Sequence, residues 1–202
     1  MKTFLNKANK IAATTLTIAS LGYASSAVSD IPGYTEWDAP SPWTTVASSC
    51  AVDESAVNKY AFNYADFYYL GSAVSSPNRK TGYNPISVRC NVDNPLDNDV
   101  RPKWDTLIIG YNDPDLEKKD ASVVARLVQV KRATGLTSVV ATFDSNTSSL
   151  TGRREGFVKF TSILDFHNNA YFVQLNLTRA NANVATPTVY SARLVSTTGI
   201  PK

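Results

Sequence analysis

The sequence predicts an all-β protein: a single antiparallel β-sandwich, jelly-roll-like, with one disulfide. Three observations carry this prediction. Apolar residues recur at alternate positions in most segments from Trp43 onward, Gly, Pro and Asn separate these segments, and no long stretch has apolar residues at helical spacing. With 202 residues, 43% of them hydrophobic and 18% charged, the chain has the composition of one ordinary globular domain.

Residues 1–27 have the three-part layout of a secretory signal peptide. Three lysines lie in the first ten residues, a mostly apolar run follows over 11–24, and small residues lead up to Ala27. The apolar run is shorter than the roughly 20 residues that span a bilayer. We therefore expect cleavage after Ala24 or Ala27, no membrane span in the mature chain, and a secreted, periplasmic or extracellular location.

Loss of that segment would balance the charge of the chain. The full sequence has 20 basic and 17 acidic residues, and removal of Lys2, Lys7 and Lys10 takes three from the basic count and leaves 17. A net charge near zero gives no general attraction to nucleic acid or anionic lipid. The adjacent Arg153 and Arg154 predict only a solvated hairpin tip, so no nucleic-acid partner is expected.

Residues 28–42 predict an extended N-terminal arm. Three prolines and one glycine fall between Asp30 and Pro42, a composition that disfavours regular structure. An extended arm can add a strand to the open sheet edge of a neighbouring molecule. The arm therefore suggests self-assembly, with the chain as a structural subunit of an extracellular assembly, and residues 43–202 are expected to form the sandwich.

Nine or ten β-strands are expected within residues 43–202. The clearest alternation places Tyr171, Val173, Leu175 and Leu177 on one face of a half-buried strand. The charged start of 116–126 predicts at most one short helical turn. The other expected strands cover residues 59–65, 67–74, 86–92, 106–111, 122–131, 138–143, 156–163 and 188–195.

Cys50 and Cys90 predict one structural disulfide. They are the two cysteines of the chain, and an isolated pair in an oxidising compartment usually forms a disulfide. A metal or redox pair would instead favour the Cys-x-x-Cys spacing, which is absent here. The alternation in 86–92 places Cys90 on the apolar face, so the disulfide is expected to reach the core.

Several segments resemble those of uncharacterised small secreted bacterial proteins with a presumed β-sandwich fold. The resemblance covers about residues 50–194 and implies a standalone exported domain, with no catalytic residue to carry over. The segments that carry it are CAVDESAVNKYAF, RCNVDNP, KWDTLIIGYNDPD, TGLTSVVATFDSN and DFHNNAYFVQLNLTRANA.

No catalytic residues are predicted, and the sequence favours a protein that is not an enzyme. His167, the sole histidine, would have to serve as the base of a hydrolase, yet no G-x-S-x-G elbow marks a serine and the adjacent Asn168 indicates a turn. Asp105 and Asp144 could form the carboxylate pair of a secreted glycan-active hydrolase. Strand-end residues that cap turns explain both more simply.

Two acidic clusters make a structural calcium ion the one cofactor considered. Calcium prefers oxygen ligands from loops, although neither cluster has the spacing of an EF-hand and Asx residues before proline are ordinary turn formers. The candidate ligands are Asp93, Asp97, Asp99, Asp113 and Asp115.

Aromatic side chains suggest a carbohydrate-binding surface. Residues 60–69 hold the densest aromatic group, and aromatic rings can stack on sugar faces, although alternation over 60–64 fits a core face equally well. The candidates for glycan binding are Trp37, Trp43 and Tyr68, the two tryptophans being the ones expected to be exposed. The sequence therefore predicts a secreted, non-catalytic module that binds a glycan or another extracellular surface ligand.

Overall fold

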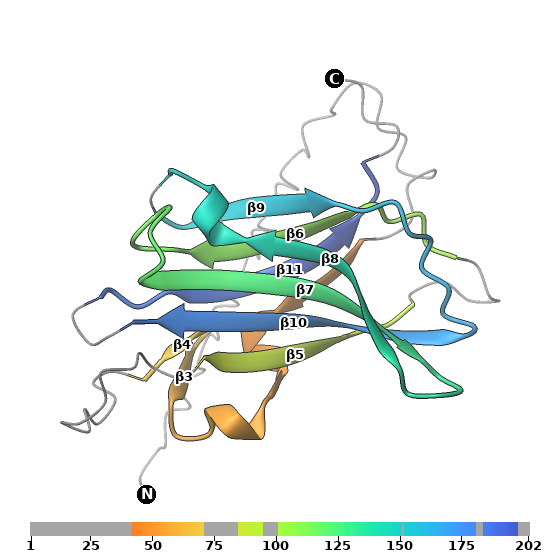
Figure 1. Cartoon of the computed structure of the whole chain (residues 1–202), viewed down its shortest axis with the longest axis horizontal. Helices are drawn as coiled ribbons and strands as arrows, with labels where there is room; N and C mark the ends of the chain where they lie inside the picture. Colours follow the sequence, from red (N-terminus) through yellow and green to blue (C-terminus); the bar gives the residue numbers. More distant parts are fainter. Residues whose placement is uncertain (1–41, 71–84, 95–100, 151, 181–183, 198–202) are drawn as a thin grey trace, which may run out of the picture. The chain divides into compact units, whose positions relative to one another are not determined.

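The computed structural model describes residues 42–70, 85–94, 101–150, 152–180 and 184–197. The predicted signal peptide and the predicted arm, except Pro42, lie outside these ranges. Within them, two antiparallel sheets pack face to face, and the chain passes repeatedly from one to the other (Figure 1). The prediction of a jelly-roll-like β-sandwich is confirmed.

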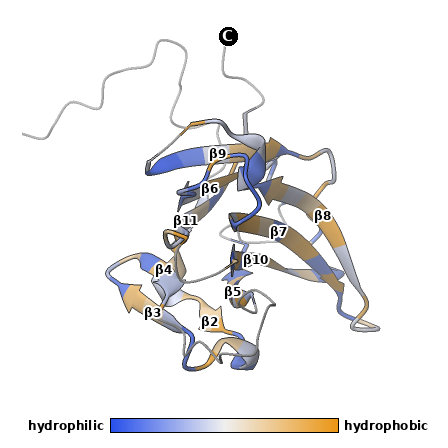
Figure 2. Cartoon of the chain, turned by 60° about the vertical axis from the view of Figure 1, so that its left-hand side comes forward, coloured by the Kyte–Doolittle hydropathy of each residue, from blue (hydrophilic) through white to orange (hydrophobic). Residues whose placement is uncertain are grey.

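The six-stranded sheet has the order β3-β4-β11-β6-β9, and β1 also pairs with β11. The five-stranded sheet has the order β2-β5-β10-β7-β8. Figure 2 shows the two sheets nearly edge-on, on opposite sides of the core. The strands are β1 Trp43–Val46, β2 Ala51–Val52, β3 Tyr60–Asn63, β4 Asp66–Tyr69, β5 Ile86–Val92, β6 Thr106–Asn112, β7 Ala121–Lys131, β8 Thr137–Asp144, β9 Arg154–Lys159, β10 Asn169–Arg179 and β11 Thr188–Val195.

Alternation of apolar and polar residues builds the core, as predicted. On β10, the side chains of Tyr171, Val173, Leu175 and Leu177 are buried, while the residues between them are half-buried on the outer face. The six-stranded sheet contributes equally buried side chains from the facing side, including Ile109. Since successive side chains of a strand point to opposite faces, each sheet keeps a second, outward face for other contacts.

Some strand boundaries differ from the prediction. The segment predicted over 59–65 is a strand only over Tyr60–Asn63, because Tyr64 adopts a positive φ of 53° and turns the chain. The segment 156–163 leaves its sheet after Lys159. The short strands β1 and β2 were not predicted individually, since two to four residues give too little alternation to detect.

The predicted helical turn at 116–126 is a tight loop followed by a strand. Lys118 donates its backbone N–H to the Asp115 carbonyl at 3.3 Å, and Leu116 adopts a positive φ of 68° that ends any helical continuation. Strand β7 then begins at Ala121. The apolar residues of this segment therefore belong to the strand.

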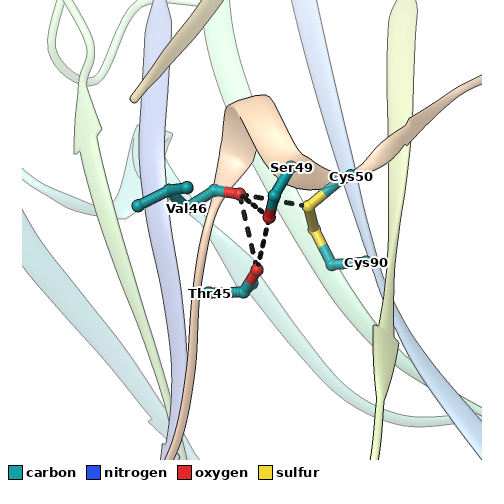
Figure 3. Close-up of a disulfide and its surroundings, with 5 residues drawn as sticks. All are labelled: Thr45, Val46, Ser49, Cys50 and Cys90. Carbon is teal, nitrogen blue, oxygen red and sulfur yellow. Dashed lines mark hydrogen bonds between the residues drawn. A yellow bond between two sulfur atoms is a disulfide. The ribbon is translucent and has the colours of Figure 1, made fainter. Parts of the chain in front are cut away.

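The predicted disulfide is confirmed and lies at the side of the core (Figure 3). Cys50 follows a single 3-10 turn, Ala47–Ser49, at the end of β1, and Cys90 lies in β5 with only 2% of its surface exposed. Cys50 directly precedes β2, and β2 pairs with β5, so the bond joins two neighbouring segments at the edge of the five-stranded sheet. The Ser49 hydroxyl donates to the Val46 carbonyl at 2.8 Å and holds this turn.

Candidate functional site

A row of polar side chains crosses the outer face of the five-stranded sheet. Arg89 on β5 lies opposite Gln174 on β10, which lies opposite Arg126 on β7, which lies opposite Thr142 on β8. These strands run side by side in Figure 1. Because neighbouring strands are about 4.8 Å apart, the four residues form a continuous polar row over four strands.

Two further rows flank the first one. On one side, Ser87 lies opposite Asn176 in β10, and Asn176 lies opposite Val124 in β7. On the other side, Phe172 lies between Asn91 and Val128 and is half-buried. The outer face of this sheet thus combines amide, hydroxyl and guanidinium groups with one aromatic ring.

The donors at the centre of this face have few acceptors within the protein. The side-chain nitrogen of Asn176 is buried and has no hydrogen-bond partner. The Gln174 amide nitrogen donates to the Ser87 hydroxyl at 3.4 Å, close to the limit of a hydrogen bond, and Arg126 takes part in none of the ion pairs among the described residues. We call Arg126, Gln174 and Asn176 the donor face.

Arg89 lies next to the donor face, on β5, but is not part of it. Its guanidinium forms an ion pair with Asp53 at 2.5 Å. The hydrogen bond from Arg89, with those from Ser55, holds the pKa of Asp53 below its ordinary value. Since its charge is balanced by this carboxylate, Arg89 differs from Arg126, whose guanidinium has no such partner in the part of the chain that the structure describes.

The outward face of the six-stranded sheet carries a polar cluster that is satisfied internally. The Arg153 guanidinium lies 4.4 Å from the centre of the Tyr190 ring and binds both Asp66 carboxylate oxygens, at 2.7 and 2.8 Å. The Tyr190 hydroxyl donates to the Arg154 carbonyl at 2.7 Å. A Cβ at Gly110 would overlap the Tyr190 ring, so glycine is needed beneath it. The Arg153 side chain is 56% exposed, as the predicted solvated tip requires, but its ion pair with Asp66 was not predicted.

The three predicted glycan-binding aromatics are not brought together within the described residues. Tyr68 lies on β4 opposite Thr188, on the same sheet face as Tyr190, and is half-buried. Trp43 lies in β1 and packs against the core, so it is not the exposed ring that we expected. Trp37 lies outside the described residues.

The dense aromatic segment is mainly a packing feature. The rings of Tyr60, Phe62 and Phe67 lie with their centres 5.2 to 5.6 Å apart, and Phe67 is fully buried. Tyr64 is 96% exposed, but it lies alone at the turn between β3 and β4. Phe67 and Tyr69 of β4 belong to the core, whereas Phe62 and Tyr64 are exposed, so the core interpretation of the alternation over 60–64 was wrong for these two rings.

Asp113 and Asp115 form a carboxyl pair in the loop between β6 and β7, with Asp113 buried and Asp115 half-buried. The Ser145 hydroxyl donates to Asp113, and the backbone N–H of Ala121 donates to Asp115 at 2.7 Å. Asp113 is only 3% exposed. Burial raises the pKa of Asp113 to about 7, and the neighbouring Asp115 carboxyl adds to this effect. Asp113 therefore keeps its proton up to about neutral pH.

The structure does not test the calcium prediction fully. Asp93 is exposed after β5, and Asp97 and Asp99 lie outside the described residues. Within the described ranges, no three His, Cys, Asp or Glu side chains lie close enough together to hold a metal ion. A structural calcium ion stays a prediction.

The candidate catalytic residues have structural hydrogen bonds. The backbone N–H of His167 donates to the Asp165 carboxylate at 3.2 Å, and its carbonyl accepts from Arg132 at 3.0 Å. Asp105 accepts from the Thr197 hydroxyl at 2.9 Å. Asp144 accepts from the Asn146 backbone at 3.0 Å and caps a short 3-10 turn. These contacts are typical of turn and capping residues.

A separate groove lies at one end of the sandwich, between residues 101–105 and 159–163. Its volume is about 670 Å³, and its lining includes the mostly buried rings of Trp104 and Phe160 and the exposed side chain of Ile163. Lys103 and Lys159 contribute positive charge to its wall. The groove shares no residue with the donor face.

None of the helices among the described residues could span a membrane.

Comparisons with known proteins find a likeness of fold. No family model and no curated protein matches the sequence. The solved xylan-binding module CBM86 from Roseburia intestinalis shares 12% identity at a TM-score of 0.40, covering 77% of this chain and 96% of that one. The xylan-binding module CBM15 shares 11% identity at a TM-score of 0.43, covering 78% and 97%.

A third solved structure matches over part of its own length. A family two carbohydrate esterase from Cellvibrio japonicus shares 11% identity at a TM-score of 0.36, covering 78% of this chain and 34% of the esterase. These likenesses concern the arrangement of strands alone. The function of this chain is therefore inferred from its own side chains.

Proposed function

We propose that this chain is a non-catalytic saccharide-binding module and that the donor face is its binding surface. The observation that carries the proposal is the placement of Arg126, Gln174 and Asn176 on neighbouring positions of one sheet face, with donors that find no good acceptors among the described residues. Leaving such donors unpaired costs free energy, which a bound acceptor would recover.

Saccharides have the chemistry that this face would recognise. Sugar hydroxyl groups both donate and accept hydrogen bonds, and so do the amides of Gln174 and Asn176. The half-buried ring of Phe172 lies two residues from Gln174 on the same strand and face, where it could contact the apolar side of a sugar ring. A few polar groups beside an aromatic ring are typical of small-ligand sites.

The positions of the carboxylates support binding without catalysis. Hydrolysis of a glycosidic bond usually needs two carboxyl groups that reach the substrate from both sides of the bond. Asp113 and Asp115 lie together, but Asp113 is almost completely buried and hydrogen-bonded to Ser145. Asp105 and Asp144 accept hydrogen bonds from nearby backbone N–H or hydroxyl groups.

The same proposal includes export of the chain. The disulfide is consistent with an oxidising compartment, and the first 27 residues have the layout of a cleaved signal. We expect the module to bind its saccharide outside the cytoplasm. Strand donation by residues 28–42 stays a prediction, since all of the arm but Pro42 lies outside the described residues.

Replacement of Gln174 or Asn176 by Ala should weaken saccharide binding by about 3- to 10-fold each, the range expected for loss of a hydrogen bond between neutral groups. Isothermal titration of the purified chain against a panel of soluble neutral and acidic polysaccharides measures this effect. Tyr68→Ala is the control, because Tyr68 lies on the other sheet.

Two results would overturn the proposal. One is a wild-type chain that binds none of the polysaccharides. The other is a loss of affinity in Tyr68→Ala while Gln174→Ala and Asn176→Ala keep wild-type affinity. Thermal unfolding of each variant shows that a lost affinity does not reflect a lost fold.

A further inference from the structure

Arg126 is a half-buried cation at the centre of the outer face of the five-stranded sheet. Gln174 lies opposite it on one side and Thr142 on the other, and neither residue carries a charge. None of the ion pairs or side-chain hydrogen bonds among the described residues satisfies its guanidinium. A partly desolvated charge without a counter-ion is costly, so this position favours an anion from outside the chain.

Two other arginines, Arg89 and Arg153, form ion pairs with carboxylates, whereas Arg126 forms none within the described residues. Arg89 pairs with Asp53 at 2.5 Å, and Arg153 pairs with both oxygens of Asp66. In each case the carboxylate comes from a segment far away in sequence. Among the described residues, the fold thus supplies carboxylates to these two outward-facing arginines but not to Arg126, on the same face as Arg89, nor to Arg193, on the other sheet.

The acidic residue nearest to Arg126 in the strand register does not serve as its partner. Asp144 lies on β8 opposite Val124, two positions along from Thr142, which is the residue opposite Arg126. Its carboxylate accepts from the Asn146 backbone at 3.0 Å and forms no ion pair with Arg126. The charge of Arg89 on the same face is balanced by Asp53.

We infer that the saccharide bound by the donor face is acidic and that Arg126 binds the carboxylate of a uronic acid residue. This inference rests on the proposed function. A guanidinium presents two parallel N–H groups in a plane, which match the two oxygens of a carboxylate. Gln174, directly opposite Arg126, would then bind hydroxyl groups of the same sugar residue, and Asn176 those of its neighbour.

The test compares polymers that differ only in charge. Polygalacturonate and alginate are titrated into the purified chain beside their fully methyl-esterified forms, which keep the sugar and lose the negative charge. The wild-type chain should bind at least one uronate polymer about 10-fold or more tightly than its ester, the effect of one charge-assisted contact. Dextran and dextran sulfate form a second pair, which shows whether a sulfate ester binds in place of the carboxylate.

Arg126→Gln should weaken binding of the uronate polymer by about 10- to 100-fold and weaken binding of the ester by a smaller factor. Arg126→Lys keeps the charge but loses the two parallel N–H groups of the guanidinium, so it should retain an intermediate affinity. Arg193→Gln is the matched control: Arg193 is also half-buried and outward-facing, but it lies on β11 of the other sheet. Its replacement should not change the affinity.

The outcomes separate the inference from the proposed function. Equal binding of uronate and ester, unchanged affinity in Arg126→Gln, or an equal loss in Arg193→Gln would overturn the inference while saccharide binding stands. Tighter binding of dextran sulfate than of either uronate would overturn the assignment of a carboxylate. Absence of binding to every polymer, charged or neutral, would overturn both.

Discussion

Removal of the disulfide should lower the free energy of unfolding by about 4 kcal/mol. The bond joins Cys50 and Cys90 across 40 positions of sequence, and a cross-link of that length restricts the unfolded chain strongly. Chemical denaturation of the Cys50→Ala/Cys90→Ala double variant, beside the wild type, measures the difference.

Reducing agent provides the control for this prediction. It should destabilise the wild type by a similar amount and leave the double variant unchanged, since the described residues hold no free cysteine. A loss below about 1 kcal/mol in the double variant would contradict the prediction, because it would mean that the cross-link hardly restricts the unfolded chain.

Asp113→Asn should remove a pH dependence of stability between about pH 4 and pH 7. The folded-state pKa of Asp113, about 7, lies above the ordinary value of 3.8, so the folded chain keeps a proton that the unfolded chain releases. The wild type therefore loses stability as the pH rises through this window, by up to about 4 kcal/mol. The Asn side chain resembles the protonated carboxyl and should show no such loss.

Denaturation of both proteins at several pH values between 4 and 8 measures this difference. Asp53→Asn is the control: the hydrogen bond from Arg89 lowers the pKa of Asp53 below its ordinary 3.8, so this carboxyl stays ionised across the range and its replacement should not change the pH dependence. Parallel stability curves for the wild type and Asp113→Asn across the window would show that Asp113 is ionised in the folded protein.

Much of the fold could be predicted because it depends on local alternation. Inward positions of β10 such as Val173 and Leu175 are buried as the sequence indicates, and Cys90 lies on the apolar face of β5. The short β1 escaped prediction because alternation over so few residues is not distinguishable from chance. Its position depends on pairing with β11, which joins the two ends of the domain.

The candidate site could be predicted only in part. The sequence shows Gln174 and Asn176 on the polar side of their strand, but it does not show which strands lie beside β10. The row that joins them to Arg126 exists because β7 and β10 pair across a long stretch of sequence. The pairing of Arg153 with Asp66, 87 positions apart, is equally non-local, and for that reason the sequence indicates an exposed arginine but not its partner.

Mapping the saccharide on the protein by NMR tests the central claim most directly. The chain is titrated with the polysaccharide fragment that binds most tightly, and chemical-shift changes are followed for backbone and side-chain amides. The account predicts the largest changes at the side-chain amides of Gln174 and Asn176 and at the Arg126 guanidinium, on the outer face of the five-stranded sheet. Changes confined to the other sheet, around Tyr68 and Tyr190, would contradict it.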